Sequence, residues 1–151
     1  MQGVNDVKAG SIPATLAFRL GMLGTLMTDR IATKIAALHL KPKHVGMLST
    51  LDAGGAASQL DVARTLRVAP SLVVGLADHL EQLGAIQRLR DSGDRRRQVL
   101  TLTDAGRDLL QTCLSAAQTL DAELTATLSP DDRAALARIV GQLAAAADLP
   151  R

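Results

Sequence analysis

Apolar residues in the first part of the chain recur at helical spacing. From Pro13 to Leu40 they follow one another in steps of three and four, which places them on one face of a helix. The members of this stripe are Leu16, Leu20, Leu23, Met27, Ile31, Ile35 and Leu38. Because the stripe is longer than a small domain of its own would cover, we expect part of it to pack elsewhere.

A second helix is bracketed by two local signals. Pro42 suits the first position of a helix, where its missing N–H is not needed. Val45, Leu48 and Leu51 continue a helical stripe, and Gly54-Gly55 predicts its end.

Two shorter helices follow. Ser58 and Asp61 have the spacing of a capping box, which predicts a helix that runs to about residue 66. Pro70 opens another helix, and Gly84 ends it. The turn between them, Arg67-Val68-Ala69, is short enough for a helix-turn-helix, although it lacks the glycine often found there.

The period then changes from helical to alternating. Residues 85–90 and 98–103 alternate apolar and polar side chains, and Asp91-Ser92-Gly93-Asp94 between them is typical of a turn. This pattern predicts a β-hairpin with the arginines of 95–97 at its tip. A helix-turn-helix followed at once by a basic hairpin is the order of a winged helix.

Two long helices are predicted after the hairpin. Thr103 caps the first, which extends to about residue 128, and Ser129-Pro130-Asp131-Asp132 opens the last, which ends at about residue 147. Together with 13–40, these helices carry more apolar surface than one compact lobe buries. We therefore expect a symmetric dimer, with packing inside one monomer as the open alternative.

The amino-acid composition excludes some classes of function. Of the 151 residues, 47% are hydrophobic, yet Phe18 is the one member of the Phe, Trp and Tyr set, which excludes recognition of bases by aromatic stacking. No apolar run reaches the length of a membrane span, the first residues lack an export pattern, and there is a single cysteine. We therefore expect a cytoplasmic protein that does not contact membranes.

The stretch around the hairpin resembles the MarR (multiple antibiotic resistance regulator) family. The residues that carry the resemblance are Leu83-Gly84-Ala85-Ile86-Gln87-Arg88, then Asp94-Arg95-Arg96, then Leu102-Thr103-Asp104-Ala105-Gly106. The resemblance covers nearly the whole chain, because the long flanking helices match in order and length. It implies one domain over 1–151, mainly α with a small β-hairpin, in which a winged helix-turn-helix at 42–102 is flanked by dimerisation helices at 13–40 and 103–147.

The family resemblance also implies a homodimeric transcription factor, commonly a repressor, that binds double-stranded DNA at a pseudo-palindromic operator and is released by a small molecule. The side chains that we expect to meet DNA are Ser58, Gln59, Arg64, Arg67, Ser71, Leu72, Val74, Arg88, Arg90, Asp94, Arg95, Arg96 and Arg97. By resemblance, Arg96 enters the minor groove and Asp94 orients it.

The helix from Pro70 departs from the family. Where many members have Thr-Arg, this chain has Val74-Gly75. If Val73, Leu76, Ala77, Leu80 and Leu83 face the core, the residues that face DNA are Ser71, Val74, Gly75 and Asp78, with Leu72 at the margin. That face has no bidentate donor for guanine but can pack against thymine methyl groups, so we expect an A·T-rich operator.

For the effector, we expect a cleft beside His44, at the start of the second helix, that suits an anionic metabolite. Arg19 would contribute charge, and Phe18, Met22 and Met47 an apolar wall. His39, His44 and His79 lack metal-ligand spacing, so we expect no metal and no cofactor. Cys113 lies on an apolar stripe and is expected to be a buried structural residue.

Catalytic motifs are missing from the sequence, which has no Gly-x-Ser-x-Gly, phosphate-binding glycine loop, Cys-x-x-Cys or His-Glu-x-x-His. We therefore expect no enzyme activity. The alternative that remains is a winged helix that binds another protein instead of DNA.

Overall fold

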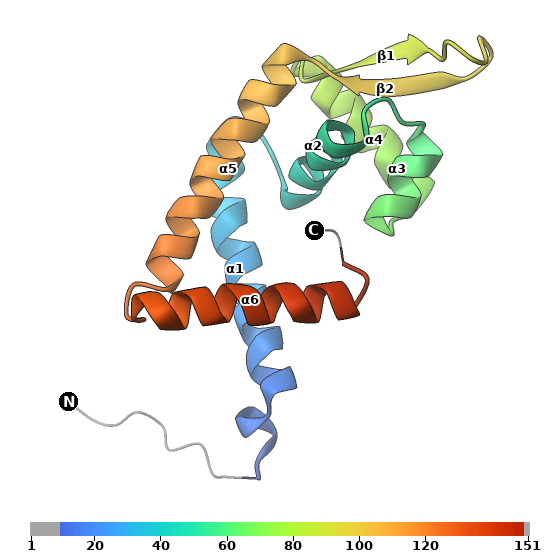
Figure 1. Ribbon diagram of the computed structural model, residues 1–151. Coiled ribbons are helices and arrows are strands. Elements are labelled where there is room, and N and C mark those ends of the chain that lie inside the picture. Colours follow the sequence, from blue (N-terminus) through green and yellow to red (C-terminus); the bar gives the residue numbers. More distant parts are fainter. Residues whose placement is uncertain (1–9, 150–151) are drawn as a thin grey trace. The chain divides into compact units, whose positions relative to one another are not determined.

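The computed structural model describes residues 10–149 (Figure 1). The helices are α1 (Leu16–Ile35), α2 (Pro42–Gly54), α3 (Gln59–Leu66), α4 (Pro70–Gln82), α5 (Asp104–Leu124) and α6 (Pro130–Ala146), and the strands are β1 (Ile86–Arg90) and β2 (Gln98–Leu102). Short 3₁₀ turns, Ile12–Ala14 and Ala36–Leu38, flank α1. The predicted class, mainly α with one small hairpin, is confirmed.

Contacts within the chain fall into two compact units. The first extends to Ala117 and contains the winged helix, and the second begins at Gln118 and contains the end of α5 and all of α6. In the part of the chain that the structure describes, no helix combines the length and the apolar character that crossing a membrane requires.

Helix ends follow the local signals closely. Pro42, Pro70 and Pro130 stand in the first turns of their helices, and Gly55 and Gly84 adopt positive φ after α2 and α4. The long helix predicted for 13–40 is interrupted, however. Thr15 caps α1, and after the 3₁₀ turn that follows it His39 adopts a left-handed conformation.

The first unit has one core, formed where α1, α2, α3, α4 and the hairpin meet. Its largest fully buried side chains are Ile35, Met47, Leu48, Leu51, Val62, Val73, Leu80, Ile86 and Leu100. The predicted inward face of α4 is confirmed for Val73, Leu76, Ala77 and Leu80. The prediction was wrong for Leu83, which is 38% exposed because α4 ends at Gln82 and the chain turns away from the core.

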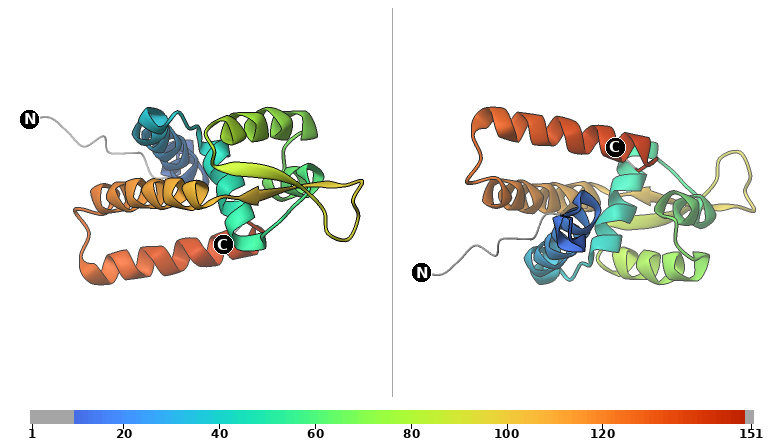
Figure 2. Two further views of the ribbon diagram at one scale, coloured as in Figure 1. Left: turned by 90° about the horizontal axis from the view of Figure 1, so that it is seen from above. Right: turned by 90° about the horizontal axis from the view of Figure 1, so that it is seen from below.

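Strands β1 and β2 pair antiparallel, from Ile86 opposite Leu102 to Arg90 opposite Gln98. Ala57, just before α3, forms a bridge to Leu100, so the hairpin is attached to the helix-turn-helix through the backbone. The loop at the far end of the hairpin extends clear of α3 and α4 in the views of Figures 1 and 2.

The junction between the hairpin and α5 explains the Leu-Thr-x-x-Gly pattern. The Thr103 hydroxyl donates to the Gly84 carbonyl at 2.6 Å and accepts from the Gly106 N–H at 3.0 Å, so it caps α5 and attaches its start to the end of α4. At Gly106, a Cβ would overlap the Ala85 carbonyl oxygen. Glycine at this position therefore allows the backbone of α5 to approach the strand closely.

Apolar side chains remain exposed on α1 in the first unit and on α6 in the second. They include Leu16, Leu20, Met22, Leu23 and Leu26 on α1 and Leu136, Ile139, Val140 and Leu143 on α6. The stripe of α1 enters the core only near its end, at Ile31 and Ile35. This division agrees with the prediction that part of the helical surface is not covered within one lobe.

Candidate nucleic-acid interface

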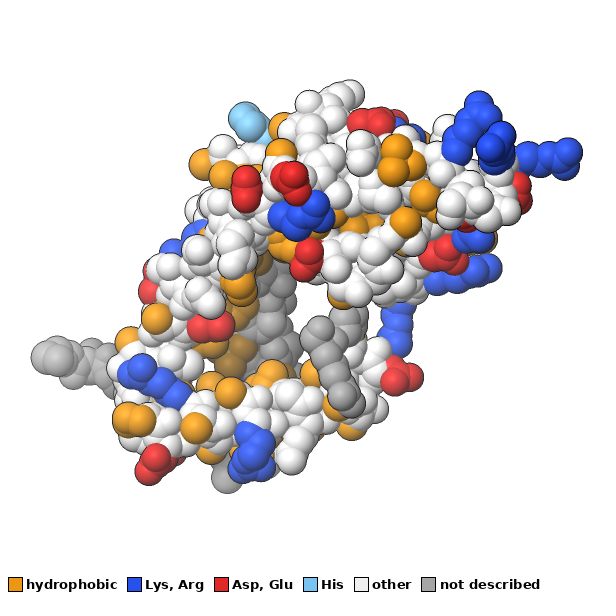
Figure 3. Space-filling view, turned by 45° about the horizontal axis from the view of Figure 1, so that its top comes forward, with side chains coloured by type: hydrophobic (Ala, Val, Ile, Leu, Met, Phe, Trp, Pro, Cys, Tyr) orange, Lys and Arg blue, Asp and Glu red, His pale blue; other side chains and the backbone are white. Residues whose placement is uncertain are grey.

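The tip of the hairpin is an arginine-bearing loop held by two carboxylates. Asp91 Oδ1 accepts from the Gly93 N–H at 2.9 Å, and Asp94 Oδ1 accepts from the Arg96 N–H at 3.0 Å. Asp94 therefore fixes the backbone of Arg96, while the guanidinium of that residue extends outward. Figure 3 shows Lys and Arg side chains gathered at this end of the hairpin.

A polar hollow lies beside the loop. Its volume is about 630 Å³, and its lining consists of Arg90, Arg95, Arg96 and Gln98. Three guanidinium groups around an open space provide donors for phosphate oxygens or for the acceptors of a narrow minor groove. Three of the arginines expected to meet DNA are thus brought together here.

Arg97 has a different environment, because it is paired with helix α3. Its guanidinium donates to Asp61 Oδ2 at 2.7 Å, and Arg64 approaches the other oxygen of this carboxylate at 3.4 Å. Hydrogen bonds from Ser58, then the charges of Arg97 and Arg64, lower the pKa of Asp61. The carboxylate therefore stays ionised and joins the loop to the helix-turn-helix.

The start of α3 differs in one detail from the predicted capping box. Ser58 Oγ accepts from the Asp61 N–H at 3.2 Å as expected. The Asp61 carboxylate, however, accepts from the Ser58 hydroxyl instead of the Ser58 N–H, because it must also face Arg97. Ser58 and Gln59 stand at the first turn of α3, where amide N–H groups point toward an incoming anion.

The turn of the helix-turn-helix is made without glycine. Arg67 has φ of 53° and ψ of 45°, and its N–H bonds to carbonyls of the last turn of α3. Arginine thus occupies the left-handed position that glycine commonly takes, which explains why the glycine signal is missing from the sequence. This conformation ends α3 and allows α4 to begin at Pro70.

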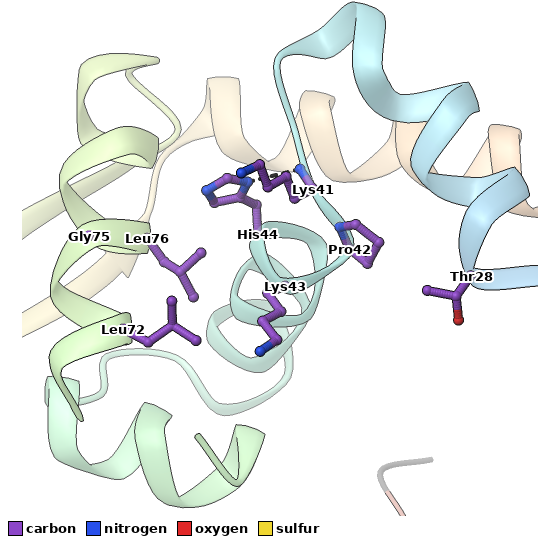
Figure 4. A pocket seen from close by; sticks show the side chains of 8 residues that line it. All are labelled: Thr28, Lys41, Pro42, Lys43, His44, Leu72, Gly75 and Leu76. Atoms are coloured by element: carbon purple, nitrogen blue, oxygen red, sulfur yellow. Dashed lines mark hydrogen bonds between the residues drawn. The ribbon is translucent and has the colours of Figure 1, made fainter. Parts of the chain in front are cut away.

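The outward face of α4 matches the prediction. Ser71, Val74, Gly75 and Asp78 are exposed, while the residues of the opposite face, Val73, Leu76, Ala77 and Leu80, are buried. Leu72 is 37% exposed, but it lines a pocket on the side of α4 that faces α2, where Figure 4 shows its side chain beside Leu76.

Arg88 is engaged within the protein. Its guanidinium forms ion pairs with Asp78 and Glu81 of α4, and its side chain is only 19% exposed. The hydrogen bond that Arg88 donates to Asp78 and the charges of both carboxylates raise the pKa of Arg88. The structure therefore places Arg88 as a clamp between β1 and α4, apart from the loop arginines.

A pocket of about 430 Å³ lies beside the start of α2 (Figure 4). Its lining consists of Thr28, Lys41, Pro42, Lys43, His44, Leu72, Gly75 and Leu76. The pocket combines two lysines with an apolar wall, and that wall belongs to α4. Lys41 and Lys43 were not singled out by the sequence, where they are two ordinary charged residues around a proline.

His44 is a buried part of this pocket, only 6% exposed. Its Nδ1 accepts from the Lys41 N–H at 2.9 Å, which requires a ring without a proton on Nδ1. The ring stacks on His79 of α4 with centroids 4.6 Å apart, and His79 Nε2 lies 2.7 Å from the His39 carbonyl oxygen. Burial, His79 and Lys41 together lower the pKa of His44.

The five expected effector residues do not share one site. Phe18, Arg19 and Met22 line a separate hollow on α1, and Arg19 Nε donates to the Pro13 carbonyl at 3.2 Å. Met47 is fully buried in the core. Of the five, His44 alone lines the pocket beside α2, because α1 runs past that pocket with Thr28 as its contribution.

Cys113 is buried, as expected, and burial raises the pKa of its thiol. It lines a small hollow with residues of α2 and α5, among them Val45 and Leu110. Among residues 10–149, no group of three or more His, Cys, Asp and Glu side chains has an arrangement that could hold a metal ion.

The fold and the interface together define a winged-helix regulator that binds DNA. The model of the MarR family matches residues 40–97, from the start of α2 to the end of the hairpin loop. The chain is 31% identical to the HTH-type transcriptional repressor MdtR of Bacillus subtilis over 107 residues, which is 71% of this chain and 69% of that protein. The chain belongs to the MarR family of transcriptional regulators.

Solved structures give the same result. YusO of Bacillus subtilis is 26% identical with a TM-score of 0.71, over 86% of this chain and 92% of that one. CouR bound to a 23-mer DNA duplex is 29% identical with a TM-score of 0.76, over 92% of this chain and 99% of that one. CouR of Rhodococcus jostii RHA1 has also been solved with p-coumaroyl-CoA. MdtR and CouR are both transcriptional repressors, in agreement with the expectation that the chain is not an enzyme.

Proposed function

We propose that the protein is a homodimeric repressor that binds a pseudo-palindromic operator in double-stranded DNA and releases it when a small anionic ligand binds. The observation that carries the DNA-binding part is the ion pair between Arg97 and Asp61. It joins the arginine loop to α3, which itself packs on α4. The arginine loop, the start of α3 and the reading helix α4 therefore form one continuous surface.

The DNA-binding part is tested by fluorescence anisotropy with labelled duplexes. Arg95→Ala combined with Arg96→Ala is expected to remove most of the affinity, because these guanidinium groups surround the polar hollow of the loop. Arg138→Ala is the matched control, because by helical geometry it lies opposite Leu136, Ile139 and Val140 on α6. Equal affinity of the double variant and the control would favour the protein-interaction alternative.

The dimeric part is supported by the exposed apolar stripes of α1 and α6. Symmetric dimers are the most common oligomers, and two reading helices related by a twofold axis suit a palindromic site. In a dimer, apolar side chains of these stripes would be covered by the partner protomer.

The ligand part is supported by the pocket beside α2. Lys41 and Lys43 supply positive charge at its mouth, and Leu72 and Leu76 supply an apolar wall. We infer that it takes a small carboxylate with an apolar body, because the lysines attract the carboxylate and the leucine wall accommodates the apolar part. Because the wall belongs to α4, an occupant acts directly on the reading helix.

Benzoate is a suitable probe of this part, since it has one carboxylate and one apolar ring. Isothermal titration calorimetry is expected to detect benzoate binding that Lys41→Ala combined with Lys43→Ala abolishes, while Arg19→Ala, in the separate α1 hollow, leaves it unchanged. Binding that requires Arg19 but neither lysine would contradict the assignment of the pocket.

A further inference from the structure

The first two turns of α4, which the structure describes in full, have little hydrogen-bonding chemistry on their outward face. That face consists of Ser71, Val74 and Gly75, and Asp78 and Gln82 follow toward the other end of the helix. In helix-turn-helix proteins the first residues of the reading helix make most contacts to base edges. The reading end of α4 therefore has one hydroxyl and one branched apolar side chain.

Asp78 is not available as an independent reader of bases. Its carboxylate pairs with Arg88, which also binds Glu81, so that three charged groups satisfy one another. Leu72 is directed to the pocket beside α2. Val74, which is 43% exposed, is thus the apolar side chain that the outward face offers to a groove.

Gly75 is the second unusual feature of this face. Glycine in the interior of a helix is less favourable than alanine. A Cβ at Gly75 would meet no atom within 4 Å, and Gly75 is not among the residues with positive φ. Gly75 also lines the pocket beside α2. No atom of the protein fills the space that its Cβ would take, and a bare backbone next to Val74 allows a base pair to approach the helix closely.

We propose that α4 recognises the C5-methyl group of a pyrimidine in the major groove, with Val74 as the contact and Gly75 as the space for close approach. The methyl group is the apolar feature of the major-groove edges, where the other groups are donors and acceptors. Thymine and 5-methylcytosine share this group, so both belong to the substrate class. The inference rests on the proposed DNA-binding function and specifies what that site reads.

The test begins with a duplex selected by the full-length protein from a random library. Each thymine of the selected site is then replaced by deoxyuridine, which removes one methyl group and keeps the base pair. At one position in each half-site the affinity is expected to fall about fourfold, the equivalent of burying one methyl group. The same position changed to 5-methylcytosine·G is expected to bind better than C·G, because the methyl group is restored.

Protein variants assign the contact. Val74→Ala is expected to reduce the difference in affinity between the thymine and deoxyuridine duplexes, since its smaller side chain covers less of the methyl group. Gln82→Ala, on the same face but at the other end of α4, retains the difference and serves as the control. Gly75→Ala is expected to raise the melting temperature of the free protein and to weaken DNA binding.

The outcomes are separable. Unchanged affinity with deoxyuridine at every position, while the unmodified duplex still binds, overturns methyl recognition and leaves the proposed function standing. A difference between thymine and deoxyuridine that is undiminished in Val74→Ala overturns the assignment to Val74. If thymine is preferred but 5-methylcytosine binds no better than cytosine, α4 recognises thymine alone, and the proposal that it recognises the C5-methyl group of either pyrimidine is wrong. Failure to bind any duplex removes both this inference and the proposed function.

Discussion

At the scale of single residues, the proposed DNA-binding surface depends on carboxylates that fix the positions of arginine side chains. Asp61 is the clearest example, because its carboxylate accepts hydrogen bonds from the side chains of Ser58, Arg64 and Arg97. The sequence indicates its capping role, since Ser58 lies three residues before it. Its pairing with Arg97, 36 positions away, depends on how the hairpin packs, and no local pattern contains that information.

His44 gives a pH dependence whose sign follows from its lowered pKa. The unfolded chain takes up a proton at the ordinary pKa of histidine, while the folded protein does so only at lower pH. Between these two pH values the unfolded state binds more protons, so the free energy of unfolding decreases as the pH falls. Acidification from pH 7.5 to 5.5 is therefore expected to lower the melting temperature.

The matched variant is His44→Gln, whose amide oxygen can accept the Lys41 N–H without titrating. The melting temperature of the variant is expected to fall less between these pH values. A parallel decrease in the two proteins would show that His44 is not the group responsible.

At the scale of elements, most of the secondary structure was predictable because its signals are local. Prolines in first turns, serine caps and the change from a helical to an alternating period gave the order and approximate bounds of α2 to α6. The misplacements have local causes as well. The single helix expected over 13–40 is limited to 16–35, because Thr15 caps its start and a 3₁₀ turn that leads to the left-handed His39 follows its end. Helix α5 ends at Leu124 before a short turn.

The clamp between β1 and α4 could not be predicted, since the sequence shows Arg88 only as one of several neighbouring arginines. Arg88→Ala is expected to weaken DNA binding, because it leaves the carboxylates of Asp78 and Glu81 unneutralised at the reading helix. Removing those charges too, with Asp78→Asn and Glu81→Gln, is expected to restore most of the affinity. Anisotropy measures both effects, and a triple variant as weak as Arg88→Ala would identify Arg88 as a direct DNA contact.

The junction of β2 and α5 gives a stability prediction. Gly106→Ala is expected to destabilise the protein by about 2 kcal/mol, within the usual range for overpacking, because the new Cβ overlaps the Ala85 carbonyl. Gly141→Ala in α6 meets no atom within 4 Å and is expected to stabilise by about 1 kcal/mol, the difference between the two residues in a helix. Chemical denaturation measures both, and equal effects would contradict the close approach at Gly106.

At the scale of the whole molecule, the effector site shows where sequence reasoning stops. His44 lines a pocket, but Phe18, Arg19, Met22 and Met47 lie elsewhere. Which residues converge on a pocket depends on how α1, α2 and α4 cross. Helical periodicity predicts which face of a helix is apolar, but it does not predict which other element that face packs against. Lys41 and Lys43 became candidates only through their positions in space.

The assembly is testable through α6. Val140→Asp combined with Leu143→Asp places two charges in its exposed apolar stripe and is expected to prevent association. In sedimentation velocity the wild type should have twice the chain mass of 15.8 kDa and the variant that mass once. Glutamine at the exposed Ala134 and Ala145 is the control that adds polar groups without charge. A wild-type monomer would refute the dimer.

The central claim, that the arginine loop holds DNA, is tested most directly by the salt dependence of binding. The logarithm of the association constant plotted against the logarithm of salt concentration has a slope set by the number of phosphates neutralised. For Arg95→Ala combined with Arg96→Ala the slope is expected to be smaller in magnitude by about 2, about 1 for each arginine. An unchanged slope, or wild-type binding that does not respond to salt, would contradict the claim.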